Sequence, residues 1–247
     1  MERNASFVAK DVSSINIRLA WAQIEVFADD VDTIQVMAAG DPSTVADLRI
    51  EYKDGVLLVE QPQYGFTINI MESKWLQVCV RIPLDWKKEL SCSTISSLLS
   101  ARKLNTDLLT LDTVTGDLHA LELTAREMTL KTVSGDIRGE NLQADKLSLR
   151  SISGDASLCG LRTGILRCTS VSGAQDYQMT ETFRKVEVNA VSGNVIITAP
   201  VDAMNVNLRS VSGRMLTEGV SITDREGCPT VNVTGVSADL KLMCINR

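Results

Sequence analysis

Short runs of alternating apolar and polar residues recur along residues 90–247 at nearly constant spacing. Alternation with a period of two residues predicts a β-strand with one buried face. Two columns of the repeat contain only apolar residues. The first comprises Leu90, Leu109, Met128, Leu147, Leu166, Val186, Val206 and Val231, and the second comprises Cys92, Leu111, Leu130, Leu149, Cys168, Val188, Leu208 and Val233. We therefore expect one strand of every repeat to face the core in the same register.

A turn motif follows each of these strands, as in "TVSGDI" at 132–137. Its glycines are separated by 19, 19, 19, 20 and 20 residues and comprise Gly116, Gly135, Gly154, Gly173, Gly193 and Gly213. A period near 20 residues predicts a solenoid. A residue without Cβ suits a corner where φ is positive or a neighbouring coil comes close. With Ser97 and Ala238 in the same column, the pattern predicts eight coils.

A second set of inward positions begins two residues after the glycine, so each coil contributes two or three strands. Equivalent strands stack about 4.8 Å apart in parallel sheets. The chain is therefore expected to be all-β, a β-solenoid with coils of 19–20 residues. If 223–229 is an inserted loop, the coil around Val231 comes last and leaves Leu240 and Leu242 near an open end. We expect end-to-end association there, or protection by Lys241, Arg247 and that loop.

Residues 1–89 are less regular and are expected to form an N-terminal β region that caps residues 90–247, the regular part of one continuous domain. "SINIRLAWAQIEV" fits the repeat with Ala22 in the glycine column, which predicts a degenerate first coil. The runs "ADLRIEY", "GVLLVEQ", "FTINI" and "WLQVCVRIP" also alternate, and "YKDGV" contains an Asp-Gly hairpin signal. No helix is signalled.

An alternating N-terminal region, a strand ending in Pro ("VCVRIP") and repeated "VSGDI" units together resemble the bacterial DUF4097 family. Its members are β-strand-repeat proteins described as "putative adhesins" and related to the head GIN domain. The resemblance covers essentially the whole chain. It implies a single-stranded right-handed β-helix, frequent export or membrane anchoring, no established enzymatic activity and no agreed functional residues.

Composition narrows the possible partners. The chain of 247 residues has a net charge of −6 and no basic run, which argues against nucleic-acid binding. No apolar stretch is long enough for direct membrane insertion, and the first residues lack the regions of a secretory signal. The sequence as written therefore predicts a cytoplasmic protein. A cell-surface or membrane-anchored location is the alternative if a signal once preceded residue 1.

The column after the glycine contains the sharpest candidate site. Asp117, Asp136 and Asp155 would stack about 4.8 Å apart and could bind a hard cation such as Ca²⁺. The competing interpretation, which we favour, is that Asp suits a turn because its side chain accepts local backbone hydrogen bonds. Asp239 shares the column, whereas Arg214 in it opposes a continuous ladder of ions. No cofactor is indicated.

Catalytic candidates are weaker. The serines before the glycines would need a base, and the chain has one histidine, His119, at an expected outward position. A carbohydrate-active β-helix would carry Asp or Glu pairs in a cleft, but such short coils leave little room for cleft walls. Four aromatic residues are too scattered for a sugar-stacking platform: Tyr64, Phe66, Tyr177 and Phe183.

The cysteines form no CxxC pair, so zinc-ribbon and thioredoxin-like sites are disfavoured. Cys92 and Cys168 share an inward column but lie four coils apart, too far for a disulfide. We expect both to be small core residues. Cys228 and Cys244 lie near the last coil, and their pairing stays open.

Two functional hypotheses follow. The first is a non-catalytic interaction or structural module, adhesin-like, that binds an unknown protein or surface glycan through its outer faces or ends. The second is a carbohydrate-binding or carbohydrate-active protein on the same scaffold.

Overall fold

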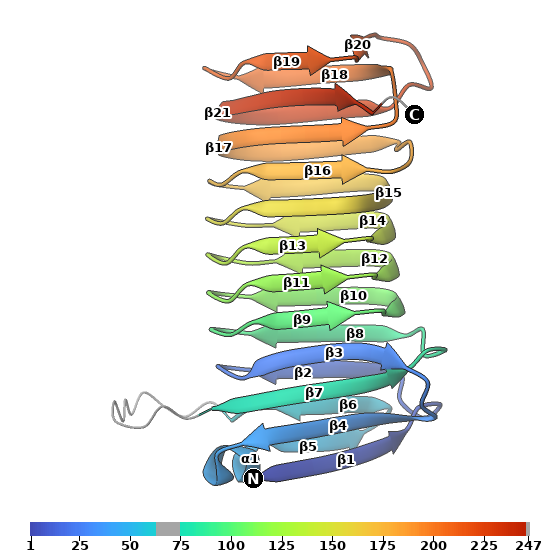
Figure 1. Cartoon of the computed structure of the whole chain (residues 1–247), viewed down its shortest axis with the longest axis vertical. Coiled ribbons are helices and arrows are strands. Elements are labelled where there is room, and N and C mark those ends of the chain that lie inside the picture. The colour runs from blue at the N-terminus through green and yellow to red at the C-terminus, as the bar shows by residue number, and fades with distance from the viewer. Residues whose placement is uncertain (63–74, 246–247) are drawn as a thin grey trace.

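The computed structural model describes residues 1–62 and 75–245, which form an elongated stack of β-strands with one short helix (Figure 1). The N-terminal elements are β1 (Glu2–Val8), β2 (Ser14–Leu19), β3 (Gln23–Asp29), β4 (Thr33–Gly40), α1 (Pro42–Asp47), β5 (Arg49–Lys53), β6 (Val56–Glu60) and β7 (Leu76–Pro83). The expected run "FTINI", with Tyr64 and Phe66, lies outside the described residues.

The remaining strands form the regular stack. They are β8 (Glu89–Thr94), β9 (Leu99–Arg102), β10 (Asn105–Thr113), β11 (Leu118–Leu121), β12 (Thr124–Lys131), β13 (Ile137–Glu140), β14 (Gln143–Arg150), β15 (Ala156–Ser170), β16 (Gln175–Met179), β17 (Lys185–Ala199), β18 (Ala203–Ser210), β19 (Met215–Glu218), β20 (Ser221–Ile222) and β21 (Thr230–Cys244).

Parallel pairing links equivalent strands of successive coils. β8, β10, β12 and β14 pair in that order along one face, and β9, β11 and β13 pair along the other. In the first face Leu109 is in register with Leu90 and Met128, two members of the apolar column. The all-β, solenoid-like arrangement expected from the sequence is confirmed.

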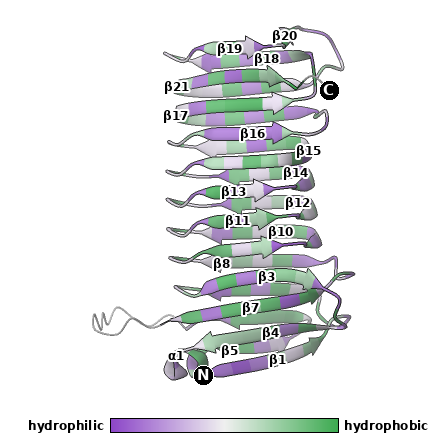
Figure 2. Ribbon diagram, in the orientation of Figure 1, coloured by the Kyte–Doolittle hydropathy of each residue, from purple (hydrophilic) through white to green (hydrophobic). Residues whose placement is uncertain are grey.

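The core lies between the two faces of the stack. The residues of the apolar columns alternate with polar residues along each strand, so apolar and polar segments alternate on the ribbon in Figure 2. Leu111, Leu130 and Leu149 are completely buried, and Cys92 and Cys168 fill equivalent positions as buried residues. The expectation that these two cysteines are core residues is confirmed.

One buried polar cluster interrupts this apolar core, and the sequence did not point to it. The Tyr177 hydroxyl donates to Gln175 Oε1 at 2.7 Å, and the Cys168 thiol donates to the same oxygen at 3.4 Å. Burial raises the pKa of the Cys168 thiol to about 11 and the pKa of Tyr177 well above its usual range. Gln175 also donates to the Ser170 hydroxyl at 3.4 Å, so the cluster satisfies itself within the core.

The N-terminal region contains the predicted degenerate coil, but it is not the first of the stack, because β6 and β7 pair with its other side. β2 and β3 pair in parallel with β8 and β9, placing Ile15 beside Leu90 and Ile24 beside Leu99. Beyond them β1, β4 and β7 form antiparallel pairs, and β5 and β6 form the predicted hairpin at Asp54 and Gly55, both with positive φ. The helix α1 was not expected, because its six residues are too few to show a helical period.

The order of the last coils differs from the sequence prediction. β21 does not end the stack but lies between β17 and the pair β18–β19 (Figure 1). Leu240 and Leu242 are therefore almost completely buried instead of lying at an open end. The outermost coil is formed by β18, β19 and β20, and Lys241 forms an ion pair with Glu218 of β19 at 2.9 Å. Arg247 lies outside the described residues.

The apolar content of the two coils explains this inverted order. In the inward columns, Leu240 lies opposite Met215, and Leu242 lies opposite Thr217. The coil with two leucines takes the interior position, where burial of each apolar side chain contributes about 2 kcal/mol. The coil with Met215 and Thr217 takes the end, where Met215 is 41% exposed.

Candidate functional site

Two edges of the stack carry polar side chains, and the first is the corner that contains the repeated motif. A Cβ on Gly135 would lie 2.0 Å from the carbonyl oxygen of Gly116 in the adjacent coil, and the other glycines of the column meet the preceding coil at similar distances. Gly213 meets Ala238 instead, which agrees with the inserted β21. Gly154, Gly173 and Gly193 also have positive φ.

The aspartates of this corner hydrogen-bond to the neighbouring coil. Asp117 Oδ1 accepts from the backbone N–H of Asp136 at 3.0 Å, and Asp136 Oδ1 accepts from Asp155 N–H at 3.0 Å. Asp155 and Asp239 accept from Ala174 and Arg214 in the same way, at 2.7 and 2.8 Å. The sequence suggested that these bonds would close the turn locally. In the structure they run between coils instead. Residues 1–62 and 75–245 contain no cluster of three His, Cys, Asp or Glu residues arranged to hold a metal ion.

The hydroxyls of this corner are also hydrogen-bonded to the backbone. Ser134 Oγ donates to the Val114 carbonyl at 3.4 Å, and Ser153, Ser172, Ser192 and Ser212 make the equivalent bond. One column earlier, Thr113 Oγ1 and Thr132 Oγ1 accept from the N–H groups of Gly116 and Gly135. His119 lies on β11, on an outward position of the strand. The aspartates and serines of this corner therefore stack the coils, whereas the threonines close the turn within their own coil.

The aromatic and sulfur candidates do not converge on a site. Tyr177 and Phe183 are buried, so neither can stack on a sugar. Cys228 is a free thiol in the loop before β21, so the pairing with Cys244 that the sequence left open is not formed.

The second edge of the stack begins where the strands β9, β11 and β13 end. Lys103, Glu122 and Asn141 adopt positive φ there, and Gly160 continues the column. The sequence did not predict this turn, because three of its four residues are not glycine, the residue that usually signals left-handed backbone. The apolar residue that follows the turn, such as the buried Leu104, then returns the chain to the core.

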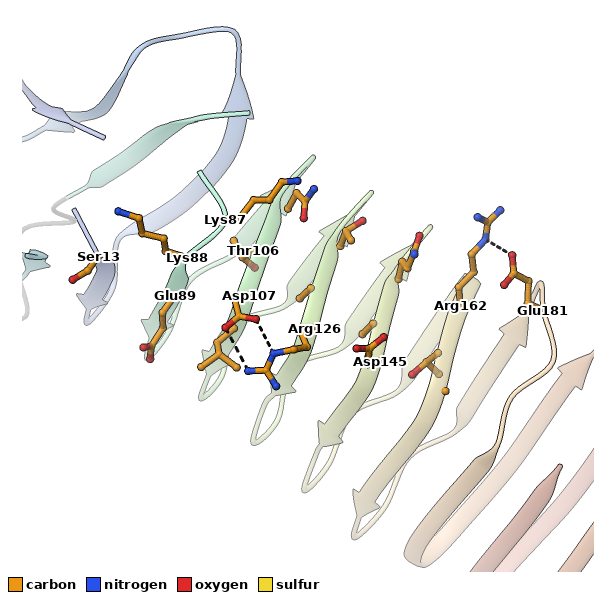
Figure 3. A pocket seen from close by; sticks show the side chains of 18 of the residues that line it. Ser13, Lys87, Lys88, Glu89, Thr106, Asp107, Arg126, Asp145, Arg162 and Glu181 are labelled. Carbon is orange, nitrogen blue, oxygen red and sulfur yellow. Dashed lines mark hydrogen bonds and ion pairs between the residues drawn. The ribbon is translucent and has the colours of Figure 1, made fainter. Parts of the chain in front are cut away.

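Beside this turn runs an open groove of about 780 Å³ that crosses several coils. Figure 3 shows its side chains, contributed by β8, β10, β12, β14 and β15 and by the segments at either end. Its polar lining includes hydroxyl and amide groups from Ser13, Asn105, Thr124, Gln143 and Thr182.

Charges alternate along the groove. The column in register with Asp107 has opposite charges on adjacent coils: Lys88, Asp107, Arg126 and Asp145. Arg126 Nε donates to Asp107 Oδ1 at 2.7 Å, and Lys88 Nζ donates to the Val12 carbonyl at 2.6 Å. Asp145 has no hydrogen bond or ion pair within the described part of the chain, so its carboxylate is available to a partner. The 19-residue spacing of these opposite charges is a sequence signal for this edge, although it was not among the features from which a site was predicted.

One residue of the groove lining, Thr106, is buried although its hydroxyl is unpaired. The residue is 4% exposed and lines the groove, yet its Oγ1 is itself buried and has no hydrogen-bond partner within residues 1–62 and 75–245. An unpaired buried hydroxyl costs about 1 to 3 kcal/mol. Thr113, completely buried on the same strand, has its hydroxyl paired with Gly116 N–H. Thr94 on β8, in the same column as Thr113, is also buried with an unpaired hydroxyl, so such a hydroxyl does not by itself mark a site.

The ion pair in the groove predicts a pH dependence of stability. Hydrogen bonding to Arg126 lowers the pKa of Asp107 below 3.8. A carboxyl whose pKa is lowered on folding stabilises the folded state above its unfolded pKa, and loses that contribution as pH falls through the folded value. We expect Asp107→Asn to lower the urea midpoint at pH 7, by an amount that shrinks as pH falls below 3.8 through the folded pKa. A deficit that does not shrink at low pH would contradict this, and Asp145→Asn is the unpaired control.

Comparison with known proteins places this architecture in a family. The model of the Toastrack DUF4097 family matches residues 12–241. A "putative adhesin" from Bacteroides fragilis is 15% identical, with a TM-score of 0.58 and 98% and 97% of the two chains covered. A "putative lipid binding protein" from Parabacteroides distasonis is 15% identical, with a TM-score of 0.63 and 97% and 96% covered.

A "putative adhesin" from Parabacteroides distasonis is 14% identical over 98% and 97% of the two chains, with a TM-score of 0.63. No curated protein matches the chain. Among the described residues, no helix is long and apolar enough to cross a membrane. At these identities the solved structures support the fold, and the family model supports the assignment. The chain belongs to the Toastrack DUF4097 family.

Proposed function

We propose that this protein is a non-catalytic, adhesin-like module that binds a macromolecular partner along the groove at the second edge. The observation that carries the proposal is the open groove that crosses several coils and contains the carboxylate of Asp145, which has no hydrogen bond or ion pair within the described residues. The open shape supports an extended partner, because a groove that crosses several coils contacts a chain along its length. The Asp corner is the poorer candidate, since the carboxylates of Asp117, Asp136 and Asp155 already accept hydrogen bonds from the next coil.

The lining supports a polar ligand. Asp145 offers an unpaired acceptor, and Lys87 offers a cation with no ion pair in the described part of the chain. Hydroxyl and amide groups between them match the hydrogen-bonding groups of a glycan, which makes a surface polysaccharide the second candidate. The lining contains no aromatic ring, so such binding would rest on hydrogen bonds instead of stacking. A lipid tail, suggested by the name of one structural neighbour, would need an apolar wall that this groove lacks.

A pair of matched substitutions tests the location of the site. Gln143 lies exposed in the groove, and Gln178 lies exposed on β16, outside it. We expect Gln143→Trp to reduce binding of the labelled protein to its ligands on an array of glycans and matrix proteins by roughly tenfold, because the indole fills the groove. Gln178→Trp is expected to bind like the wild type. Equal binding by both variants, or a larger loss with Gln178→Trp, would place the site elsewhere.

The same array separates the two classes of partner. Binding confined to glycans would support the second candidate, and binding confined to proteins would support a protein partner. A hydrolase screen on the glycans that bind tests the absence of catalysis, since release of reducing ends by the purified protein would contradict the non-catalytic proposal.

An adhesin-like role also implies a location outside the cytoplasm, unlike the cytoplasmic location that the sequence as written predicts. The two "putative adhesin" neighbours support a cell-surface location. Protease treatment of intact native cells tests it: surface protein is expected to be degraded, and full protection would favour the cytoplasm.

A further inference from the structure

β21 occupies a slot between two parts of the chain that precede it. On one side it pairs with β17 from Thr230 opposite Lys185 to Cys244 opposite Ala199. On the other side it pairs with β18 and β19. Inward side chains anchor it in the core, since Val231, Val233 and Leu242 are completely buried.

Both walls of the slot hold β21 in one register. Lys185 and Asn205 both lie opposite Thr230, and Val195 and Met215 both lie opposite Leu240. The slot therefore recognises a strand through two main-chain ladders and one row of apolar pockets. None of these contacts depends on which copy of the chain supplies the strand.

The only covalent link between the outer wall and β21 is the loop 223–229. It leaves β20 at Ile222, which pairs with Met204 on the outer edge of β18, and reaches Thr230 on the inner edge. The loop is largely exposed, and Gly227 has a positive φ with no atom within 4 Å of the position that a Cβ would occupy. It therefore has the properties of a hinge and must pass around β18.

We propose that this slot accepts β21 from a second copy of the protein, giving a dimer in which the two copies exchange this strand. In the exchanged dimer every pairing of β21 is retained in trans. The backbone of residues 223–229 changes and gives up the bond from Asn205 Nδ2 to the Arg225 carbonyl, which is 2.9 Å in the closed loop. Beyond that bond, the exchange costs mainly the entropy of association. The partner at this end of the stack is then a copy of the same chain, held by strand exchange instead of by end-to-end contact.

Shortening the loop tests the proposal in the full chain. Crossing from one edge of β18 to the other spans about two strand spacings, near 10 Å even in a straight line. After deletion of residues 223–227, Cys228 and Pro229 alone connect the two strands and reach at most about 11 Å, too little to pass around β18. We expect this variant to be a folded dimer by light scattering. A control with 223–227 replaced by Gly-Ser-Gly-Ser-Gly is expected to remain mainly monomeric.

A second measurement keeps the proposal falsifiable if the deletion prevents folding. Two wild-type copies with different affinity tags are unfolded, mixed at high concentration and refolded together. Strand exchange predicts mixed dimers that survive dilution, whereas native copies mixed without unfolding are expected to form far fewer. The proposal is overturned if the deletion variant is a folded monomer, or if refolding yields no mixed dimer.

Discussion

Gly135→Ala is expected to lower the free energy of unfolding by about 3 kcal/mol, near the upper end of the cost of overpacking. The added Cβ would lie 2.0 Å from the Gly116 carbonyl oxygen, so the backbone of one coil must move. Gly135 has no positive φ, unlike Gly154, and the cost therefore reports the close approach alone. Urea unfolding followed by circular dichroism measures it.

The matched control for this substitution is Gly227→Ala in the loop before β21. Gly227 has a φ of +88° but no neighbour within 4 Å, so alanine meets only the backbone cost of about 1 kcal/mol. If the two substitutions cost the same, the contact between coils would not be what requires glycine in the column.

The second large effect concerns the order of the last coils. Leu240 on β21 and Met215 on β19 lie opposite each other, but Leu240 is 1% exposed and Met215 is 41% exposed. We expect Leu240→Ala to cost about 3 kcal/mol, as large-to-small changes in a core do, and Met215→Ala to cost less than about 1 kcal/mol. Thermal and urea unfolding of both variants provide the comparison.

Sequence order alone would make the opposite prediction, with Met215 inside the stack and Leu240 near its end. A larger cost for Met215→Ala than for Leu240→Ala would therefore contradict the inserted position of β21 and, with it, the slot that strand exchange requires.

The sequence predicted the solenoid because its signal is repeated. A column such as Leu90, Leu109 and Met128 marks the same inward position many times, and one irregular coil does not obscure it. The spatial order of the coils has no such signal. Val186, Val206 and Val231 share one column, and any of them can stack on another in register, so periodicity cannot decide which coils are neighbours.

The sequence predicted a candidate site at the repeated motif and none at the groove. Asp136 and its equivalents were the most conspicuous polar column, and the structure shows them bonded to the next coil. The groove depends instead on the turn at Lys103, Glu122 and Asn141, whose positive φ has no sequence signal. The unpaired hydroxyl of Thr106 could not be found from the sequence, because pairing depends on atoms contributed by other coils.

In this proposal the repeated corner holds the coils together, whereas the second edge is left for a partner. Two aspartates separate these roles, because alanine removes the carboxylate from each. Asp117 Oδ1 at the corner accepts the N–H of Asp136 in the next coil, and the Asp145 carboxylate in the groove has no hydrogen bond or ion pair within the described residues.

The most direct measurement is the affinity of Asp145→Ala and Asp117→Ala for a partner found on the array, with the unfolding free energy of each variant as the reference. Asp145→Ala is expected to fold as stably as the wild type and to bind roughly tenfold more weakly, as for one lost hydrogen bond. Asp117→Ala is expected to lose about 1 kcal/mol of stability and to keep its affinity. Undiminished binding by Asp145→Ala, with Asp117→Ala the weaker binder, would contradict the account.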